Sequence, residues 1–266
     1  MEQTQKQPFF STTRIAFIAM FATLAGVLYV LNFSLPFAFP SFLEFKLSDV
    51  PILIGTFTLG PSAGAAIVVI EILIKLVIKG TSTMFVGELS DLMTSCAFAV
   101  VAGIIYLKHR TFKGALVAMA VGTAVEVVVA LLFNRFVLVP FYITVFFHGS
   151  WEPLIGLMTP LFPNCTKDTF YTFYLWASVL PFNLLRCLVA DVITLLVYKR
   201  ISRLINTVNH KIYGNAATAA AADGESQTAG SSRATRMRKI NVAVIISAAV
   251  AVALLLAFAL LRYFVF

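Results

Sequence analysis

The side chains best able to do chemistry in this sequence are polar residues inside long apolar runs. Burying an ionisable side chain in a membrane is costly, so such a residue by default indicates a binding site or pathway. An asparagine offers a donor and an acceptor in fixed geometry, which suits a planar heterocycle, although hydrogen bonding between helices explains it equally well. The residues are Glu71, Lys75, Glu88, Asp91, Glu126, Arg135, Arg186, Asp191, Asn134 and Asn183.

Two pairs of these residues share a helix face by their spacing. Glu71 and Lys75 are four residues apart, which predicts an ion pair along one helix, with a role in a substrate pathway as the equally weighted alternative. Asn183 and Arg186 are three residues apart, one turn beyond Pro181, so both project from the same side of their helix.

Glu88 and Asp91 begin another apolar run. The helix dipole favours carboxylates at a helix N-terminus, so we predict a capping role for Asp91. With a bound metal, the same carboxylates offer the best case for a rival class, an integral-membrane enzyme acting on a lipid or prenyl substrate. The histidines fall in predicted loops or a linker and the three cysteines lack a CxxC spacing. We therefore expect no catalytic residue, metal site or cofactor.

The composition indicates an all-α integral membrane protein. Hydrophobic residues make up 60% of the chain and charged residues 12%, against roughly 25% charged in a soluble domain. The net charge is +8, and many basic residues lie in short stretches at 6–14, 108–113, 199–211 and 233–239. This positive-inside pattern predicts a cytoplasmic N-terminus and an external C-terminus, and it gives no indication of a nucleic-acid partner.

The apolar runs predict six helices in a membrane domain at residues 1–205. A Gly/Ser-rich cytoplasmic linker (206–238) and a seventh transmembrane helix (239–266) follow. Residues 34–48 are expected to fold back over the membrane domain, and residues 138–172 form the longest non-helical segment apart from a short helix near 152–158. The six predicted helices cover about residues 13–33, 49–59, 62–78, 86–107, 115–137 and 173–198.

Two local features accompany these helices. Ser48 or Asp49 is expected to cap the second helix, which is too short for a free span, and Gly60-Pro61 makes the turn after it. Small residues on the first helix permit close contact, either within the protein or with a partner helix. They are Ala16, Ala19, Ala22 and Gly26.

Four motifs in this order carry a family resemblance. They are FKLSDVPILIGTFTLGPSAG (45–64), GEL (87–89), LLFNRFVLVPFY (131–142) and LPFNLLRCL (180–188). Over roughly residues 13–205 the chain resembles the riboflavin-specific substrate-binding (S) component of energy-coupling factor (ECF) transporters. The resemblance implies a six-helix bundle in a bacterial cell membrane that binds a vitamin near its outer face. It also implies association with a membrane coupling subunit and two cytoplasmic ATPase subunits.

The resemblance also implies roles for individual residues. Asn134, Asn183 and Arg186 would contact the polar edge of the flavin, and the small residues of the first helix would dock on the coupling subunit. The segment around Leu43, Phe45, Lys46 and Leu47 would form part of a lid. We add Asp49, Lys75 and Glu88 to the predicted substrate site. Such a chain binds and delivers riboflavin without catalysis; another vitamin, or a stand-alone carrier, is the alternative within the transporter class.

Overall fold

The computed structural model describes residues 12–197, and the predicted linker and seventh helix lie outside this part. Within it, five helices are long and apolar enough to cross a membrane, and Asp49–Leu59 is a shorter apolar helix. The last long helix, Thr172–Val197, is called the final helix below. The elements are α1 (Thr12–Val30), β1 (Phe33–Ser34), β2 (Glu44–Phe45), α2 (Asp49–Leu59), α3 (Pro61–Lys79), α4 (Val86–Lys108), α5 (Phe112–Phe133), η1 (Asn134–Leu138), α6 (Val139–Phe141), η2 (Tyr142–Phe146), α7 (Glu152–Met158) and η3 (Thr172–Val179).

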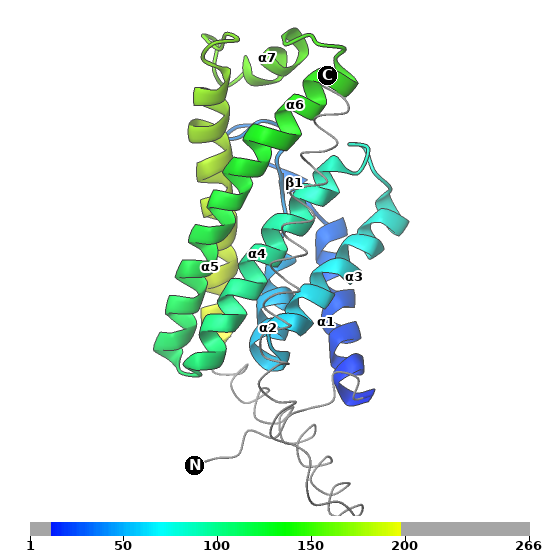
Figure 1. The fold of residues 1–266 in the computed structure, drawn as a ribbon, viewed down its shortest axis with the longest axis vertical. Coiled ribbons are helices and arrows are strands. Elements are labelled where there is room, and N and C mark those ends of the chain that lie inside the picture. Colours follow the sequence, from blue (N-terminus) through cyan, green and yellow to red (C-terminus); the bar gives the residue numbers. More distant parts are fainter. Residues whose placement is uncertain (1–11, 198–266) are drawn as a thin grey trace, which may run out of the picture.

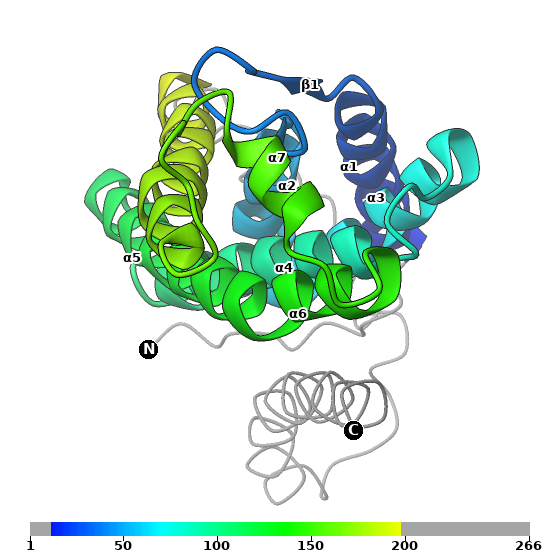
Figure 2. The same cartoon turned by 90° about the horizontal axis from the view of Figure 1, so that it is seen from above.

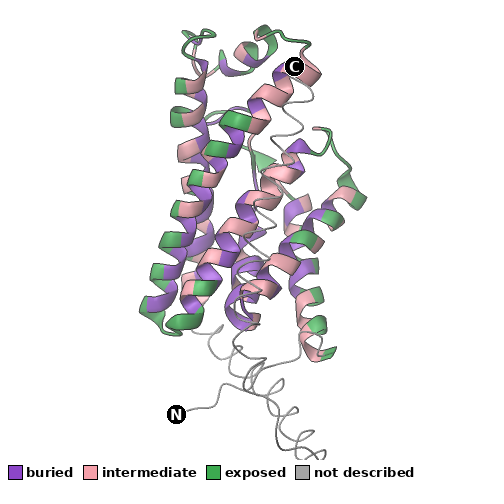
Figure 3. Cartoon of the chain, in the orientation of Figure 1, coloured by how far each residue is buried: buried purple, intermediate pink, exposed green. Residues whose placement is uncertain are grey.

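The helices form a bundle whose long axes run roughly together (Figure 1). α1, α2 and α3 pack against one another, α4 packs against α2, α3 and α5, and the start of the final helix contacts α5. The short helix α7 lies across one end of the bundle, which we call the α7 end (Figure 2). Buried residues line the inner faces of the helices and exposed ones face outwards (Figure 3). Apolar residues cover much of that outer surface, as expected for helices that face lipid.

The segment 33–48 is a hairpin that arches over the α7 end of the bundle (Figure 2). β1 and β2 pair antiparallel, with Phe33 opposite Phe45 and Ser34 opposite Glu44. Phe45 and Phe39 pack edge-on against Phe182 of the final helix, at centroid distances of 6.4 and 5.3 Å. The segment therefore folds back over the bundle as expected, but its strand pairing was not predicted.

The helix that begins at Phe112 continues to Phe146, so the prediction of non-helical structure from residue 138 was wrong as far as Phe146. Pro140 cannot donate to the carbonyl four residues back, and its ring needs space there. The wider π-helical turns η1 and η2 lie on either side of it. In an apolar environment, ending the helix at the proline would leave more backbone groups unpaired than widening it does. η3 precedes Pro181 in the same way.

Small residues bring α1, α2 and α3 close together. A Cβ on Gly26 would lie 2.8 Å from Cγ2 of Ile74 on α3, and Ala22 is also buried. These two residues of the predicted docking face therefore pack within the protein, and only Ala16 and Ala19 are exposed.

The turns at the opposite end agree with the sequence. Gly60 adopts a φ of 95°, which favours glycine, and ends α2 directly before Pro61 begins α3. Ser48 occupies the N-cap position of α2, but its side chain makes no capping hydrogen bond. Asp49 instead turns inwards to an ion pair with Arg186.

Candidate functional site

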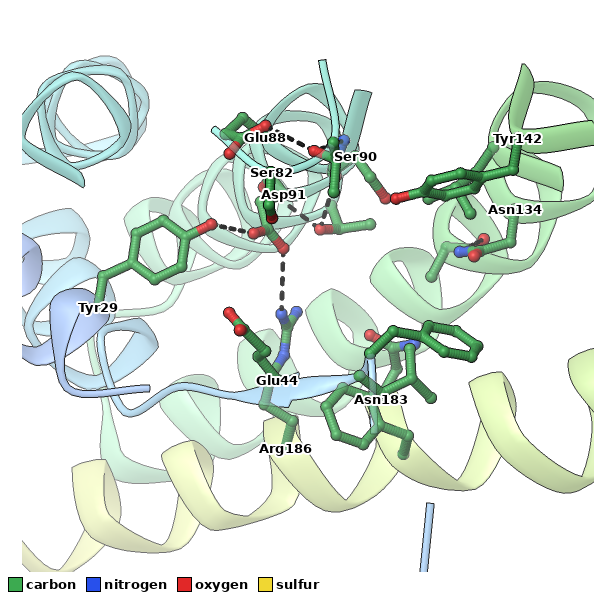
Figure 4. A pocket seen from close by; sticks show the side chains of 18 of the residues that line it. Tyr29, Glu44, Ser82, Glu88, Ser90, Asp91, Asn134, Tyr142, Asn183 and Arg186 are labelled. Atoms are coloured by element: carbon green, nitrogen blue, oxygen red, sulfur yellow. Dashed lines mark hydrogen bonds and ion pairs between the residues drawn. The ribbon is translucent and has the colours of Figure 1, made fainter. Parts of the chain in front are cut away.

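A cavity of about 220 Å³ lies among the hairpin, α1, α4, the α5–η2 helix and the final helix (Figure 4). Its walls combine aromatic rings with hydroxyl, amide and charged groups. This mixture is typical of a site for a mostly aromatic small molecule with a few polar groups. The lining residues are Tyr29, Phe42, Leu43, Glu44, Lys75, Ser82, Thr83, Gly87, Glu88, Ser90, Asp91, Thr94, Ala130, Asn134, Leu138, Tyr142, Tyr174, Phe182, Asn183 and Arg186.

Asn134 and Asn183 are held in the same way. Nδ2 of Asn134 donates to the Ala130 carbonyl at 2.8 Å, and Nδ2 of Asn183 donates to the Val179 carbonyl at 2.8 Å. Because a carbonyl only accepts, these bonds fix which way each side-chain amide faces. The oxygen of Asn134 also accepts a hydrogen bond from the Tyr174 hydroxyl at 2.5 Å. Both amides are therefore pre-oriented at the cavity wall, where a ligand can exchange hydrogen bonds with them.

Arg186 links three carboxylates beside and below the cavity. Its Nε lies 3.3 Å from Oδ2 of Asp49, its Nη1 lies 3.9 Å from Oδ1 of Asp91, and its Nη2 donates to Glu126. Asp91 also accepts a hydrogen bond from the Tyr29 hydroxyl. Asp91 thus joins α1, α4 and the final helix, which differs from the predicted capping role.

Lys46 lies behind the cavity, where it is 2% exposed. Its ammonium donates to Ser95 at 3.1 Å, lies 3.6 Å from Oδ1 of Asp91 and sits 4.5 Å above the Tyr29 ring. Burial alone would lower the pKa of Lys46, but nearby carboxylates, Asp91 first among them, outweigh burial and raise it. The lysine therefore stays charged and fixes the end of the hairpin to α4.

The predicted pair of Glu71 and Lys75 is wrong. Lys75 instead pairs with Glu88 across the α3–α4 interface. Glu71 is fully buried, and its oxygens have no hydrogen-bond partner among residues 12–197. The four-residue spacing is compatible with a pair between Glu71 and Lys75, but Lys75 contacts Glu88 of the neighbouring helix instead.

The structure places the ten predicted substrate-site residues in two layers. Six line the cavity, whereas the other four lie behind it and support its wall. In the second layer, Phe45 packs on Phe182 and Asp49 pairs with Arg186. The lining residues are Leu43, Lys75, Glu88, Asn134, Asn183 and Arg186, and the supporting residues are Phe45, Lys46, Leu47 and Asp49.

Sequence reasoning did not identify which aromatic residues line the site. Tyr29, Tyr142 and Tyr174 line the cavity with Phe42 and Phe182. The signal was a tyrosine within an otherwise apolar helix, since its hydroxyl needs a partner there. Tyr29 and Tyr174 find partners in Asp91 and Asn134.

The carboxylates considered for a metal have other partners. Glu88 pairs with Lys75, and Asp91 contacts Tyr29, Lys46 and Arg186. In the part of the chain that the structure describes, no group of three or more His, Cys, Asp or Glu side chains converges to hold a metal ion. Deeper in the bundle, Asp191 accepts a hydrogen bond from Thr123 at 3.0 Å, so it takes part in a contact between helices.

A bundle of membrane-length helices around an aromatic, polar-tipped cavity defines a membrane protein with a small-molecule binding site. The chain belongs to the family described as "ECF transporter, substrate-specific component", which matches residues 13–198. A solved structure described as the S component of a bacterial ECF transporter has the same fold. It aligns with a TM-score of 0.55 and 25% identity, covering 73% of this chain and 98% of that one.

Several curated relatives have names that state a ligand. The riboflavin transporter RibU of Staphylococcus aureus is 26% identical over 195 residues, covering 73% of this chain and 93% of its own length. The riboflavin transporter FmnP of Bacillus subtilis is 26% identical, with coverages of 70% and 90%. RibU of Lactococcus lactis is 28% identical, with coverages of 67% and 87%.

Proposed function

We propose that this chain binds riboflavin as the S component of an ECF transporter in a bacterial cell membrane. The main observation in support of this proposal is that Asn134, Asn183 and Arg186 converge on one aromatic-walled cavity. The relatives named as riboflavin transporters support the choice of vitamin.

The chemistry of the cavity suits a flavin. A flavin ring is flat and aromatic, and Phe42, Tyr142, Tyr174 and Phe182 provide apolar area for it. One edge of the ring carries carbonyl and N–H groups. An asparagine amide can donate to the first and accept from the second, so the pre-oriented Asn183 matches that edge. The hydroxyls and carboxylates elsewhere on the wall suit the hydroxyls of a ribityl chain.

The chain would work as one part of a larger assembly. The S component would bind the vitamin, whereas ATP hydrolysis would occur in two cytoplasmic ATPase subunits joined by a membrane coupling subunit. The exposed small residues Ala16 and Ala19 offer a docking strip on α1 for that coupling subunit. The positive-inside pattern supports a cytoplasmic N-terminus, and with that orientation the cavity would lie near the outer face.

Flavin titration of the purified protein tests the proposal. The detergent-solubilised chain should quench riboflavin fluorescence on binding, and in a panel of vitamins it should prefer the flavin. Asn183→Ala should weaken riboflavin binding at least about tenfold, because a polar edge of the ligand would lose its partner. Asn164→Ala is the matched control, since Asn164 is exposed in a loop outside the cavity lining. No flavin binding by the wild type, or equal affinity of the Asn183→Ala variant, would refute the assignment.

A further inference from the structure

We propose that Glu88 makes the cavity reject phosphorylated ligands, so that the uncharged vitamin binds in preference to its phosphate monoester. This inference rests on the proposed function, because it concerns which form of the flavin the same cavity accepts. It assigns to Glu88 a role in excluding one ligand as well as in shaping the site.

Two features of the cavity wall would normally attract a phosphate. Lys75 brings an ammonium group to the cavity, and the N-terminus of α4 reaches it at Gly87. An ammonium group and the N–H groups that begin a helix are both common phosphate-binding elements. Without further contacts, this corner would be an anion site.

Glu88 already interacts with both the Lys75 ammonium group and the N-terminus of α4. Its Oε1 pairs with Lys75, and it lies in the first turn of α4, where its charge offsets the helix dipole. Its Oε2 accepts hydrogen bonds from the hydroxyls of Thr81 at 3.0 Å and Thr83 at 2.9 Å. The side chain of Glu88 is 4% exposed, and both of its oxygens are engaged in these contacts.

The backbone donors at this helix start are also used. The N–H of Phe85 donates to Oγ1 of Thr81 at 3.0 Å, and the N–H of Gly87 donates to Oγ1 of Thr83 at 3.0 Å. Each threonine therefore accepts from the backbone and donates to Glu88. These backbone N–H groups and threonine hydroxyls therefore have hydrogen-bond partners without a bound anion.

The other charges on the wall act in the same direction. The lining contains three carboxylates, Glu44, Glu88 and Asp91, and two cations, Lys75 and Arg186. Both cations already contact carboxylates. A phosphate monoester carries about −1.5 to −2 charges at pH 7. It would have to displace a carboxylate from its partner and leave that carboxylate buried, whereas an uncharged ligand displaces none.

Glu88→Gln tests the inference by the ratio of two dissociation constants, that of riboflavin 5′-phosphate divided by that of riboflavin. The wild type should give a ratio of at least about ten, because like charges repel strongly in a buried site. Glu88→Gln should reduce the ratio at least about tenfold, since Lys75 is freed to pair with the phosphate. Adding Lys75→Gln to this variant should restore discrimination against the phosphate. Glu152→Gln is the matched control, because it removes a carboxylate at the α7 end outside the lining.

The outcomes separate this inference from the proposed function. If the wild type binds riboflavin but gives a ratio near one, or if Glu88→Gln leaves the ratio unchanged, the inference is wrong and the proposed function stands. An equal change in Glu152→Gln would assign discrimination to overall charge and also overturn the inference. If the wild type binds neither flavin, the proposed function itself fails.

Discussion

Arg186 on the final helix and Asp49 at the start of α2 form a buried ion pair, with 3.3 Å between Nε and Oδ2. Asp49 is fully buried and Arg186 is 3% exposed. Asp49 directly follows the hairpin, and Arg186 lies on the helix that carries Asn183. The pair therefore fixes the hairpin relative to the final helix, and both contribute residues to the cavity wall.

Arg186→Ala should lower the free energy of unfolding by about 3–5 kcal/mol, because three carboxylates would lose their shared cation. Arg186→Lys should lower the free energy of unfolding by a smaller amount, because lysine keeps the charge. It should still destabilise, because lysine lacks the planar fork that reaches Asp49, Asp91 and Glu126. Thermal melting of both variants in detergent measures the difference. Equal melting temperatures for Arg186→Ala and the wild type would show that the network contributes nothing to stability.

Glu71→Gln should leave the protein as stable as the wild type or more stable. The Glu71 carboxylate is fully buried, and both of its oxygens lack a hydrogen-bond partner within residues 12–197. The ammonium of Lys46 attracts this carboxylate, whereas the carboxylates of Asp49 and Asp91 repel it more weakly. Removing its charge therefore removes the cost of burying it, which outweighs the lost attraction to Lys46. Asp49→Asn is the contrasting variant and should destabilise, because Asp49 pairs with Arg186. The same melting assay compares them, and a reversed order would contradict the proposed charge balance.

Tyr174→Phe should weaken riboflavin binding about threefold to tenfold. The hydroxyl of Tyr174 holds the oxygen of Asn134, and losing one hydrogen bond to an orienting group has an effect of about this size. Tyr171→Phe is the control, because Tyr171 stacks on Arg135 outside the cavity. Fluorescence titration of both variants gives the comparison. An equal loss of riboflavin affinity in the two variants would show that Tyr174 does not position Asn134 for binding.

Ala19→Leu and Gly26→Leu should separate docking from packing on α1. Gly26→Leu should destabilise the protein by about 1–3 kcal/mol, because its side chain would overlap Ile74. Ala19→Leu should leave stability and flavin affinity unchanged but reduce flavin uptake by cells, since Ala19 is exposed on the proposed docking strip.

Ala120→Leu, at an exposed position on α5, is the control for a larger side chain facing lipid. Normal uptake by cells expressing Ala19→Leu would place the coupling subunit elsewhere.

The sequence predicted the helices well wherever an apolar run had clear ends. Gly60 and Pro61 separate α2 from α3, and the short helix at residues 152–158 appears at those residues. Pro140 misled the prediction, because proline usually ends a helix in water. In an apolar environment the unpaired backbone groups cost more, and the chain stays helical through π turns.

The residues of the site were partly visible in the sequence, but their partners were not. Composition determined that Asn134, Asn183 and Arg186 lie inside apolar helices, where polar groups need partners. Periodicity fixes only how residues are placed around one helix. The tertiary structure decided that Lys75 joins Glu88 rather than Glu71, and that Asp91 meets Tyr29, Lys46 and Arg186. Such pairings depend on how helices far apart in the chain pack, because the attraction between two charges depends on their distance in space and not on their separation in the sequence.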